Sequence, residues 1–240
     1  MRILLLGGTG EARALAARLH PEYDIVSSLA GRVPDPALPV GPVRIGGFGG
    51  IDGLRRWLRD DDIDAVVDAT HPFASTMTAH AAQVCTELGM PYLVLSRPAW
   101  DPAGAIRVSS DVDAAQVIAD QHYSRVFLTT GRSGVRPFTD SNAWFLIRVV
   151  TPPAADVLPR NHEVLLSRGP YGYDDEFALL RDNKIDVLVT KNSGGALTEA
   201  KLHAAKDLGV AIVMIDRPPL PAGVTAVGTV EEAATWVAGL

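Results

Sequence analysis

Short apolar runs alternate with helical segments along the whole chain, and most of the runs end at a turn that contains glycine or threonine. This alternation is typical of parallel strands joined by crossover helices, because helices cover both faces of a parallel sheet and its strands are therefore almost entirely apolar. The pattern predicts strands near residues 2–6, 24–28, 43–45, 65–69, 92–95, 125–129, 144–149, 164–167, 186–190, 211–215 and 225–227. It predicts helices near residues 11–19, 51–59, 75–88, 112–121, 174–181, 196–208 and 230–237. We therefore expect an α/β protein.

The chain also contains a weak internal repeat. Residues 63–98 resemble residues 185–218: both begin with Ile-Asp before an apolar run, and both end with Leu-Gly and Arg-Pro at the same spacing. Each copy continues into a short strand and a capped helix, with Asp111 and Thr229 at the expected N-caps. Convergence on a common βαβ pattern is the alternative explanation. The repeat favours two similar halves.

The Pro- and Gly-bearing stretch 97–104 has few strand or helix signals and is the expected connection between the halves. We predict two Rossmann-like parallel-sheet domains that face each other across a cleft. The first, residues 1–100, would bind the cofactor, and the second, residues 101–240, the substrate. Residues 106–121 could pack with either half.

Composition narrows the class of partner. The 240 residues carry 22 basic and 28 acidic side chains, a net charge of −6, and no run of Lys or Arg. Nucleic acids and anionic membranes require a concentrated positive field, so neither is expected as a partner. No stretch approaches the roughly 20 apolar residues of a membrane helix. The oligomeric state stays open.

Cysteine and histidine usage bears on compartment and metals. The single cysteine, Cys85, excludes an internal disulfide framework and suits a reducing cytoplasm. The six histidines show no metal-ligand spacing, and no metal site is expected.

The turn after the first predicted strand reads Gly-Gly-Thr-Gly-Glu-Ala-Arg. Glycines in such a turn let the backbone approach a pyrophosphate, and the amides at the start of the following helix can bind it. The match to the dinucleotide fingerprint is imperfect, because Arg13 stands where the last glycine belongs, and a merely tight turn is the alternative. The predicted cofactor residues here are Gly7, Gly8, Thr9, Gly10, Glu11 and Ala12.

The tip of the second predicted strand indicates which dinucleotide binds. An NAD site carries an acidic residue there for the ribose hydroxyl, whereas an NADP site carries small polar groups and an arginine for the 2′-phosphate. This chain has no acid at that tip but has Ser28 and Arg32. A capped turn with a solvated arginine is the alternative. If a dinucleotide binds, the sequence favours NADP(H).

The fourth predicted strand runs into Thr70, His71, Pro72 and Phe73. In a dinucleotide fold this turn lies near the nicotinamide, where His71 could orient the substrate or move a proton. A hydrogen-bonded structural histidine is an equally good interpretation of His71.

Turns in the second half combine backbone amides, hydroxyls and cations, which suits anionic groups. Solvated helix caps are the alternative for each turn alone, and a further loop, 167–171, is of the same kind. The predicted substrate-binding residues are Thr130, Gly131, Arg132, Lys191, Asn192, Ser193, Gly194 and Lys201. Lys191 is also a second candidate for the catalytic proton donor.

Four of these segments together resemble one family, the precorrin-6A reductases of cobalamin biosynthesis: residues 7–13, 68–74, 130–132 and 190–195. The resemblance spans nearly the whole chain, and its His-Pro-Phe-Ala and Lys-Asn-Ser-Gly motifs are its most specific parts. It implies NADPH-dependent reduction of a corrin-ring double bond, from precorrin-6A to precorrin-6B. The many carboxylates of such a tetrapyrrole agree with the anion-binding turns. His71, Lys191 and water stay open as the proton donor, and the substrate could be metal-free or contain cobalt.

Two other functions compete with this one. A two-domain regulatory protein could bind the dinucleotide without turnover, since two halves joined by a hinge suit sensing as well as catalysis. A short-chain dehydrogenase is disfavoured, because no tyrosine is followed by lysine at the Y-x-x-x-K offset. Consumption of NADPH in the presence of a corrin precursor separates the reductase from the regulatory protein.

Overall fold

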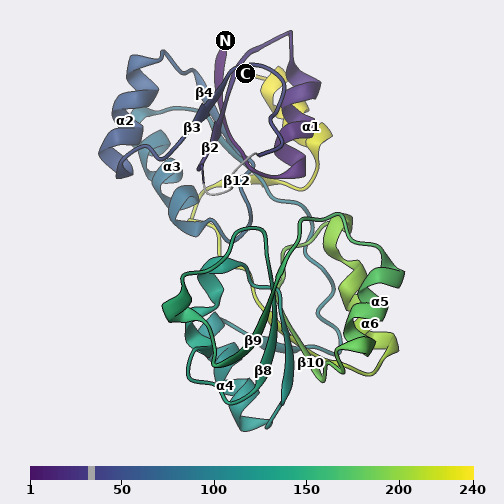
Figure 1. Cartoon of the computed structure of the whole chain (residues 1–240). Helices are drawn as coiled ribbons and strands as arrows, with labels where there is room; N and C mark the ends of the chain where they lie inside the picture. Colours follow the sequence, from purple (N-terminus) through teal and green to yellow (C-terminus); the bar gives the residue numbers. More distant parts are fainter. Residues whose placement is uncertain (32–35) are drawn as a thin grey trace. The chain divides into compact units, whose positions relative to one another are not determined.

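The computed structural model describes residues 1–31 and 36–240, which divide into two compact units. The first unit comprises Met1–Pro98 and Pro218–Leu240, and the second comprises Ala99–Arg217. Each unit contains one six-stranded sheet in which all neighbouring strands are parallel, as the alternating pattern predicts (Figure 1). Within the described residues, none of the helices has the length and apolar character needed to cross a membrane.

The sheet of the first unit has the strand order β12-β5-β4-β1-β2-β3. The strand order reverses between β1 and β4, because the chain builds β2 and β3 on one side of β1 and the remaining strands on the other. The elements of this unit are β1 (Arg2–Leu6), α1 (Gly10–Leu19), β2 (Asp24–Leu29), β3 (Val43–Ile45), α2 (Gly50–Asp60), β4 (Ala65–Asp68), α3 (Ser75–Leu88), β5 (Tyr92–Leu95), β12 (Thr225–Val227) and α7 (Val230–Ala238).

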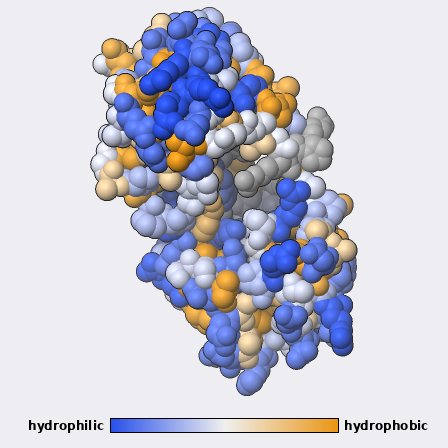
Figure 2. All heavy atoms as spheres, turned by 90° about the vertical axis from the view of Figure 1, so that its left-hand side faces the viewer, coloured by the Kyte–Doolittle hydropathy of each residue, from blue (hydrophilic) through white to orange (hydrophobic). Residues whose placement is uncertain are grey.

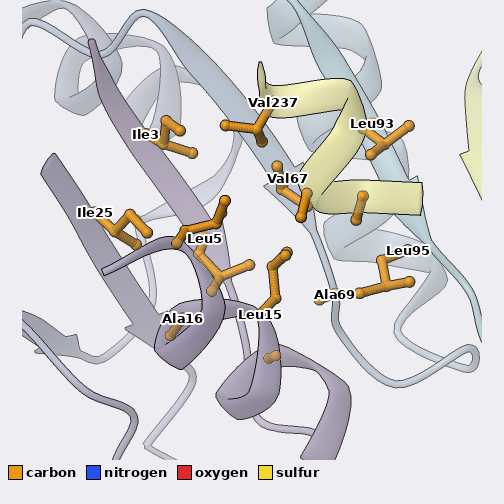
Figure 3. Packing of buried hydrophobic residues seen from close by; sticks show 14 residues of the cluster. Ile3, Leu5, Leu15, Ala16, Ile25, Val67, Ala69, Leu93, Leu95 and Val237 are labelled. Atoms are coloured by element: carbon orange, nitrogen blue, oxygen red, sulfur yellow. The ribbon is translucent and has the colours of Figure 1, made fainter. Parts of the chain in front are cut away.

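Strand β1 supplies side chains to two cores, because successive residues of a strand point to opposite faces of the sheet. Ile3 and Leu5 pack with α1 and α7 on one face, and Figure 3 shows them beside Leu15 and Val237. The alternate residues of β1 pack with α2 and α3 on the other face. Burial on both faces explains why this strand is a continuous apolar run.

Helix α2 has one buried face and one solvated face. Leu54 and Leu58 are buried, whereas Asp52, Arg56 and Arg59 are exposed. Figure 2 views the molecule from this side, and hydrophilic residues cover much of the first unit there.

The sheet of the second unit has the equivalent order β6-β11-β10-β7-β8-β9, with its reversal between β7 and β10. Where the first unit has α1 after its first central strand, this unit has two short 3₁₀ turns, η1 and η2. Its elements are β6 (Ile106–Val108), α4 (Asp111–Asp120), β7 (Arg125–Leu128), η1 (Arg132–Gly134), η2 (Arg136–Phe138), β8 (Trp144–Val149), η3 (Ala155–Val157), β9 (Asn161–Leu166), α5 (Tyr173–Asp182), β10 (Val187–Lys191), η4 (Ala196–Thr198), α6 (Ala200–Asp207) and β11 (Ala211–Ile215).

The structure corrects the expected division of the chain at its C-terminal end. The segment 218–240 was assigned to the second half, but β12 pairs with β5, with Thr225 opposite Leu93, and α7 packs with α1 in the first unit. Conversely, β6 pairs with β11 in the second unit, with Ile106 opposite Val213. The last strand and helix of each repeat thus complete the sheet that belongs to the other repeat. Their sequences are alike, so local pattern could not distinguish the two pairings.

Smaller differences concern element ends. Ser110 caps α4, and Asp111 is instead its first residue, whereas Thr229 caps α7 in a capping box as expected. The helix predicted over 196–208 is a 3₁₀ turn followed by the shorter α6. Strand β9 begins at Asn161, earlier than predicted, because its first residues are polar and exposed at a sheet edge and carry no apolar signal.

Candidate functional site

Most of the predicted cofactor residues lie at one edge of the first sheet. In doubly wound sheets, ligands bind outside the carboxyl ends of the strands at the point where the strand order reverses. The turns after β1 and β4 meet at this point, and the Thr9 hydroxyl donates to the Ala69 carbonyl at 2.7 Å. Ser28, at the end of β2, lies opposite Leu6 in the neighbouring strand. The three predicted cofactor segments are therefore adjacent.

The glycine turn has the geometry of a phosphate-binding loop. Gly8 has φ +112°, where other residues are strained, and a Cβ on it would meet no atom within 4 Å. Thr9 caps α1 by accepting a hydrogen bond from the Ala12 amide at 3.1 Å. The Thr9 side chain braces the turn, so the groups suited to a pyrophosphate are the backbone amides at the start of this ten-residue helix. The open space over Gly8 fits such a ligand.

Glu11 is engaged within the protein. Its carboxylate accepts a hydrogen bond from Arg97 at 2.8 Å, and this arginine belongs to the Arg-Pro pair of the internal repeat. The salt bridge neutralises a negative charge beside the glycine turn. Sequence reasoning gave Arg97 no role at the site, although its recurrence as Arg217 was a usable signal.

An unpredicted arginine binds the predicted serine. Arg44 lies opposite Ser28 in the β2–β3 pairing, and its Nη1 donates to the Ser28 hydroxyl at 2.9 Å. The same guanidinium donates to the carbonyls of Gly46 and Gly47 at 2.9 and 3.1 Å and lies 3.9 Å from the Phe48 ring centroid. Arg32, the arginine that the sequence favoured, lies outside the described residues.

The electrostatic state of Arg44 is unusual for an arginine. All three acceptors of its hydrogen bonds are uncharged oxygens, and no ion pair found in residues 1–31 and 36–240 includes it. Partial burial lowers the pKa of Arg44, which the charge of Asp61 opposes, and the group stays cationic. Beside the end of β2, Arg44 of β3 thus carries a positive charge that is hydrogen-bonded to neutral groups.

A buried carboxylate shapes the turn after β4. Asp68 accepts from the backbone amide and the hydroxyl of Thr70 at 3.0 and 2.6 Å. Its other oxygen accepts from Thr78 at 2.7 Å and from Tyr92 at 3.1 Å. Burial, reinforced by the negative charge of Asp68, raises the pKa of Tyr92, which keeps its proton and donates. These four hydrogen bonds fix the direction in which the chain enters the His-Pro-Phe segment.

His71 has a defined tautomer in this turn. The Phe73 amide donates to Nδ1 of His71 at 3.3 Å, and the ring centroids of His71 and Phe73 lie 5.8 Å apart. Since Nδ1 accepts, the neutral imidazole carries its proton on Nε2. The Nε2–H of neutral His71 can therefore donate a hydrogen bond, whereas proton donation would require the imidazolium form.

The second unit repeats this arrangement at its own reversal point, between β7 and β10. The Lys191 ammonium donates to the Thr130 carbonyl at 2.9 Å and lies 3.5 Å from a carboxylate oxygen of Asp111. Burial raises the pKa of Asp111, and the Lys191 charge opposes that shift. Gly131 follows with φ +81°, and Arg132 opens η1 with an exposed side chain. The two predicted turns therefore meet, with Asp111 as a partner that the sequence had assigned only to a helix cap.

Two of the predicted substrate residues are buried against Trp100. Both amide atoms of Asn192 bond the Trp100 backbone, and Asn192 is 6% exposed. Lys201 is 3% exposed, and its ammonium donates to the Thr198 carbonyl and lies 4.3 Å from the Trp100 ring centroid. Burial, reinforced by the charge of Arg148, lowers the pKa of Lys201 to about 7. Both side chains are therefore buried, whereas the sequence predicts them on a substrate-binding surface.

A buried ion pair lies close to Lys201. Arg148 and Glu176 form a bidentate pair that is almost fully buried, and the Arg148 guanidinium lies 3.7 Å from the centroid of the Tyr171 ring. Neither charge was singled out from the sequence, because each stands in an otherwise ordinary strand or helix pattern.

The part of the chain that the structure describes contains no cluster of three or more His, Cys, Asp or Glu side chains that could hold a metal ion.

Comparison with known proteins gives consistent matches over the whole chain. The family described as precorrin-6x reductase CbiJ/CobK matches residues 2–238. A precorrin-6A reductase of Mycobacterium tuberculosis (strain CDC 1551 / Oshkosh) is 71% identical over 239 residues, which cover 100% of this chain and 98% of the relative. A precorrin-6A reductase of Rhodococcus erythropolis is 53% identical, with the same coverage of the two chains. A cobalt-precorrin-6A reductase of Methanothermobacter thermautotrophicus is 30% identical over 91% of this chain and 77% of the relative.

A solved structure has the same fold. It is titled CobK precorrin-6A reductase, is 37% identical in sequence, and superposes with a TM-score of 0.92 over 100% of this chain and 96% of that chain.

Proposed function

Because the chain belongs to the precorrin-6x reductase family, we propose that it reduces precorrin-6A in cobalamin biosynthesis with NADPH as the hydride donor. Reduction of a CH–CH group by a reduced nicotinamide follows from the family, whereas the phosphorylated cofactor and the residue roles below are our proposal. The observation that carries the proposal is the reversal point of the first sheet, where the glycine turn, Ser28 and the His-Pro-Phe turn are adjacent. A cytoplasmic location, where NADPH is available, is part of the proposal.

The pyrophosphate would bind at the start of α1. Backbone amides from Gly8 to Glu11 present the positive end of the helix dipole, and Gly8 leaves space for the ligand. Thr9 holds this turn against β4, and Arg97 keeps the Glu11 carboxylate from repelling the phosphates.

The 2′-phosphate would bind Ser28 and Arg44, together with Arg32. A phosphate dianion would bind Arg44 more strongly than the neutral oxygens that Arg44 now contacts, because its charge is opposite and two of its oxygens can accept from the planar guanidinium. Stacking on Phe48 holds the guanidinium plane in place.

When bound, the nicotinamide supplies a hydride to one carbon of the ring double bond. Thr70, Pro72 and Phe73 would shape its pocket, and the Nε2 proton of His71 would orient it or the substrate. Lys191 would supply the proton to the neighbouring carbon, since its ammonium is already held by the Thr130 carbonyl and Asp111.

The substrate carboxylates would bind the turns of the second unit. The turn after β7 offers backbone amides and a cation, from Thr130, Gly131 and Arg132. The turn at the end of β10 offers the same groups, from Lys191, Ser193 and Gly194. Asn192 and Lys201 would not contact the substrate themselves but would hold Trp100 in place.

Turnover of precorrin-6A tests this function. Purified protein is mixed with precorrin-6A and either NADPH or NADH, and the absorbance of the reduced nicotinamide is followed. We expect rapid oxidation of NADPH and much slower oxidation of NADH. NADPH binding without oxidation would favour the regulatory protein, and equal use of both cofactors would reject the 2′-phosphate site.

Arg44→Gln tests the cofactor preference directly. Losing a charge-assisted contact to phosphate costs about 1.5–3 kcal/mol, so the Kd of NADPH should rise about 10- to 150-fold and the Kd of NADH less than about twofold. NADH occupies the same site without the phosphate and reports any general damage to the site. Arg55→Gln, which removes an α2 arginine paired with Glu87, is the matched control. Equal weakening of both cofactors in Arg44→Gln would show that Arg44 only supports the loop.

A further inference from the structure

Both linkers between the units fasten to the same loop. The chain passes from the first unit to the second once, after Pro98, and returns after Arg217. We define the outgoing linker as residues 96–105 and the return linker as residues 216–224. The loop is residues 192–195, directly after β10 and next to Lys191.

The outgoing linker holds the loop through Trp100. The Asn192 side chain accepts from the Trp100 amide at 2.8 Å and donates to the Trp100 carbonyl at 3.1 Å. The Trp100 indole donates to the Gly195 carbonyl at 3.1 Å. Trp100 and Asn192 are 5% and 6% exposed, so these bonds face little competition from water.

The return linker holds the loop through Arg217, which begins the Arg-Pro pair of the second repeat. Its Nε donates to the Asn192 carbonyl at 2.8 Å, and its Nη2 donates to the Ser193 carbonyl at 3.0 Å. The Asn192 amide in turn donates to the carbonyl of Ile215, the last residue of β11. Asn192 is thus bonded on its side chain to one linker and on its backbone to the other.

Two glycines give this loop a backbone conformation that other residues rarely adopt. Gly194 and Gly195 both have positive φ, at +65° and +80°. Glycine adopts positive and negative φ about equally easily, so these values alone do not fix the loop. Three of its four carbonyls, those of Asn192, Ser193 and Gly195, accept hydrogen bonds from the two linker residues. The shape of the loop therefore depends on these contacts.

We propose that Asn192 and Arg217 are positioning residues that tie this loop to both linkers and thereby hold Lys191 and Ser193 in the register that the reduction requires. The proposal rests on the proposed function for the part that Lys191 and Ser193 play at the substrate. Small displacements of a reacting group cost large factors in rate, so the effect belongs in kcat rather than in cofactor binding.

Asn192→Ala and Arg217→Lys test the proposal, because lysine keeps the charge but cannot bond two carbonyls as a planar fork. With precorrin-6A, we expect kcat to fall about 10- to 100-fold in Asn192→Ala, and less in Arg217→Lys. The Kd of NADPH should stay within about twofold of wild type, since the proposed cofactor residues lie in the first unit. Asn183→Ala removes a comparable amide-to-carbonyl bond, to Leu179 at 2.8 Å in the same unit, and should leave kcat unchanged.

Amide hydrogen exchange of residues 193–195 gives a readout that needs no turnover. Exchange should be faster in Asn192→Ala and Arg217→Lys than in wild type and unchanged in Asn183→Ala. Wild-type exchange in both loop variants, or wild-type kcat together with faster exchange, would overturn the proposal. If wild-type protein fails to reduce precorrin-6A while the variants exchange faster, the proposed function fails and the attachment of the loop to the linkers stands. Arg217→Lys keeps the test available if Asn192→Ala does not fold.

Discussion

Lys201→Met should change how the stability of the protein depends on pH. The folded protein holds Lys201 with a pKa of about 7, whereas the unfolded chain has the ordinary value of 10.5. Between these values the unfolded state binds more protons, so raising the pH favours the folded state. Below pH 7 both states are protonated, and the full cost of burying the ammonium is present. Above pH 10.5 both are neutral, and the cost is absent.

The size of the effect follows from the two pKa values. Each pKa unit corresponds to about 1.4 kcal/mol, so burial of the charged Lys201 costs about 5 kcal/mol. Methionine removes that cost, but it also removes the hydrogen bond to the Thr198 carbonyl, worth about 1 kcal/mol. At pH 6 the Met variant should therefore be more stable than wild type by about 3–4 kcal/mol. At pH 10.5 and above it should be slightly less stable.

The assay is urea unfolding of wild type and variant from pH 6 to pH 10, followed by tryptophan fluorescence. The second unit holds Trp100 and Trp144, and the variant isolates the contribution of Lys201 from other groups that titrate in this range. Lys206→Met, at an exposed position on the same helix, controls for loss of a lysine from α6. A constant difference between wild type and Lys201→Met across this range would refute the reasoning.

Two further substitutions test the first unit. Asp68→Asn should destabilise the protein by about 2 kcal/mol or more and weaken NADPH binding. Asparagine has one acceptor oxygen where aspartate has two, so it cannot accept all four bonds from Thr70, Thr78 and Tyr92. Urea unfolding and an NADPH titration check this, and unchanged binding would separate the β4 turn from the cofactor site. Gly8→Ala should cost about 1–3 kcal/mol of stability and reduce NADPH affinity, because φ +112° strains any other residue; an alanine variant with wild-type stability and affinity would contradict the assigned geometry of the turn.

The sequence alone was enough to predict the two parallel α/β sheets and most element ranges. Strand periodicity, glycine turns and helix caps are features of neighbouring residues, so the sequence shows them directly. The apolar runs predicted as strands are strands in the structure, and strands such as β1 are buried on both faces. The same local logic brought the predicted cofactor segments to one sheet edge, because turns that follow parallel strands share that edge.

Long-range pairing decided the rest. The strands β6 and β12 carry similar sequences, and only their registers with β11 and β5 show that each completes the sheet of the other repeat. Arg44 contacts Ser28 in the candidate site because β3 pairs with β2 and places Arg44 opposite Ser28. Asn192 and Lys201 moved from the predicted surface to the interior because Trp100, some hundred residues away in sequence, covers them. The local sequence determines which residue types stand in a turn. Segments distant in the chain determine which partners those residues contact, and the contacts determine whether the residues are buried.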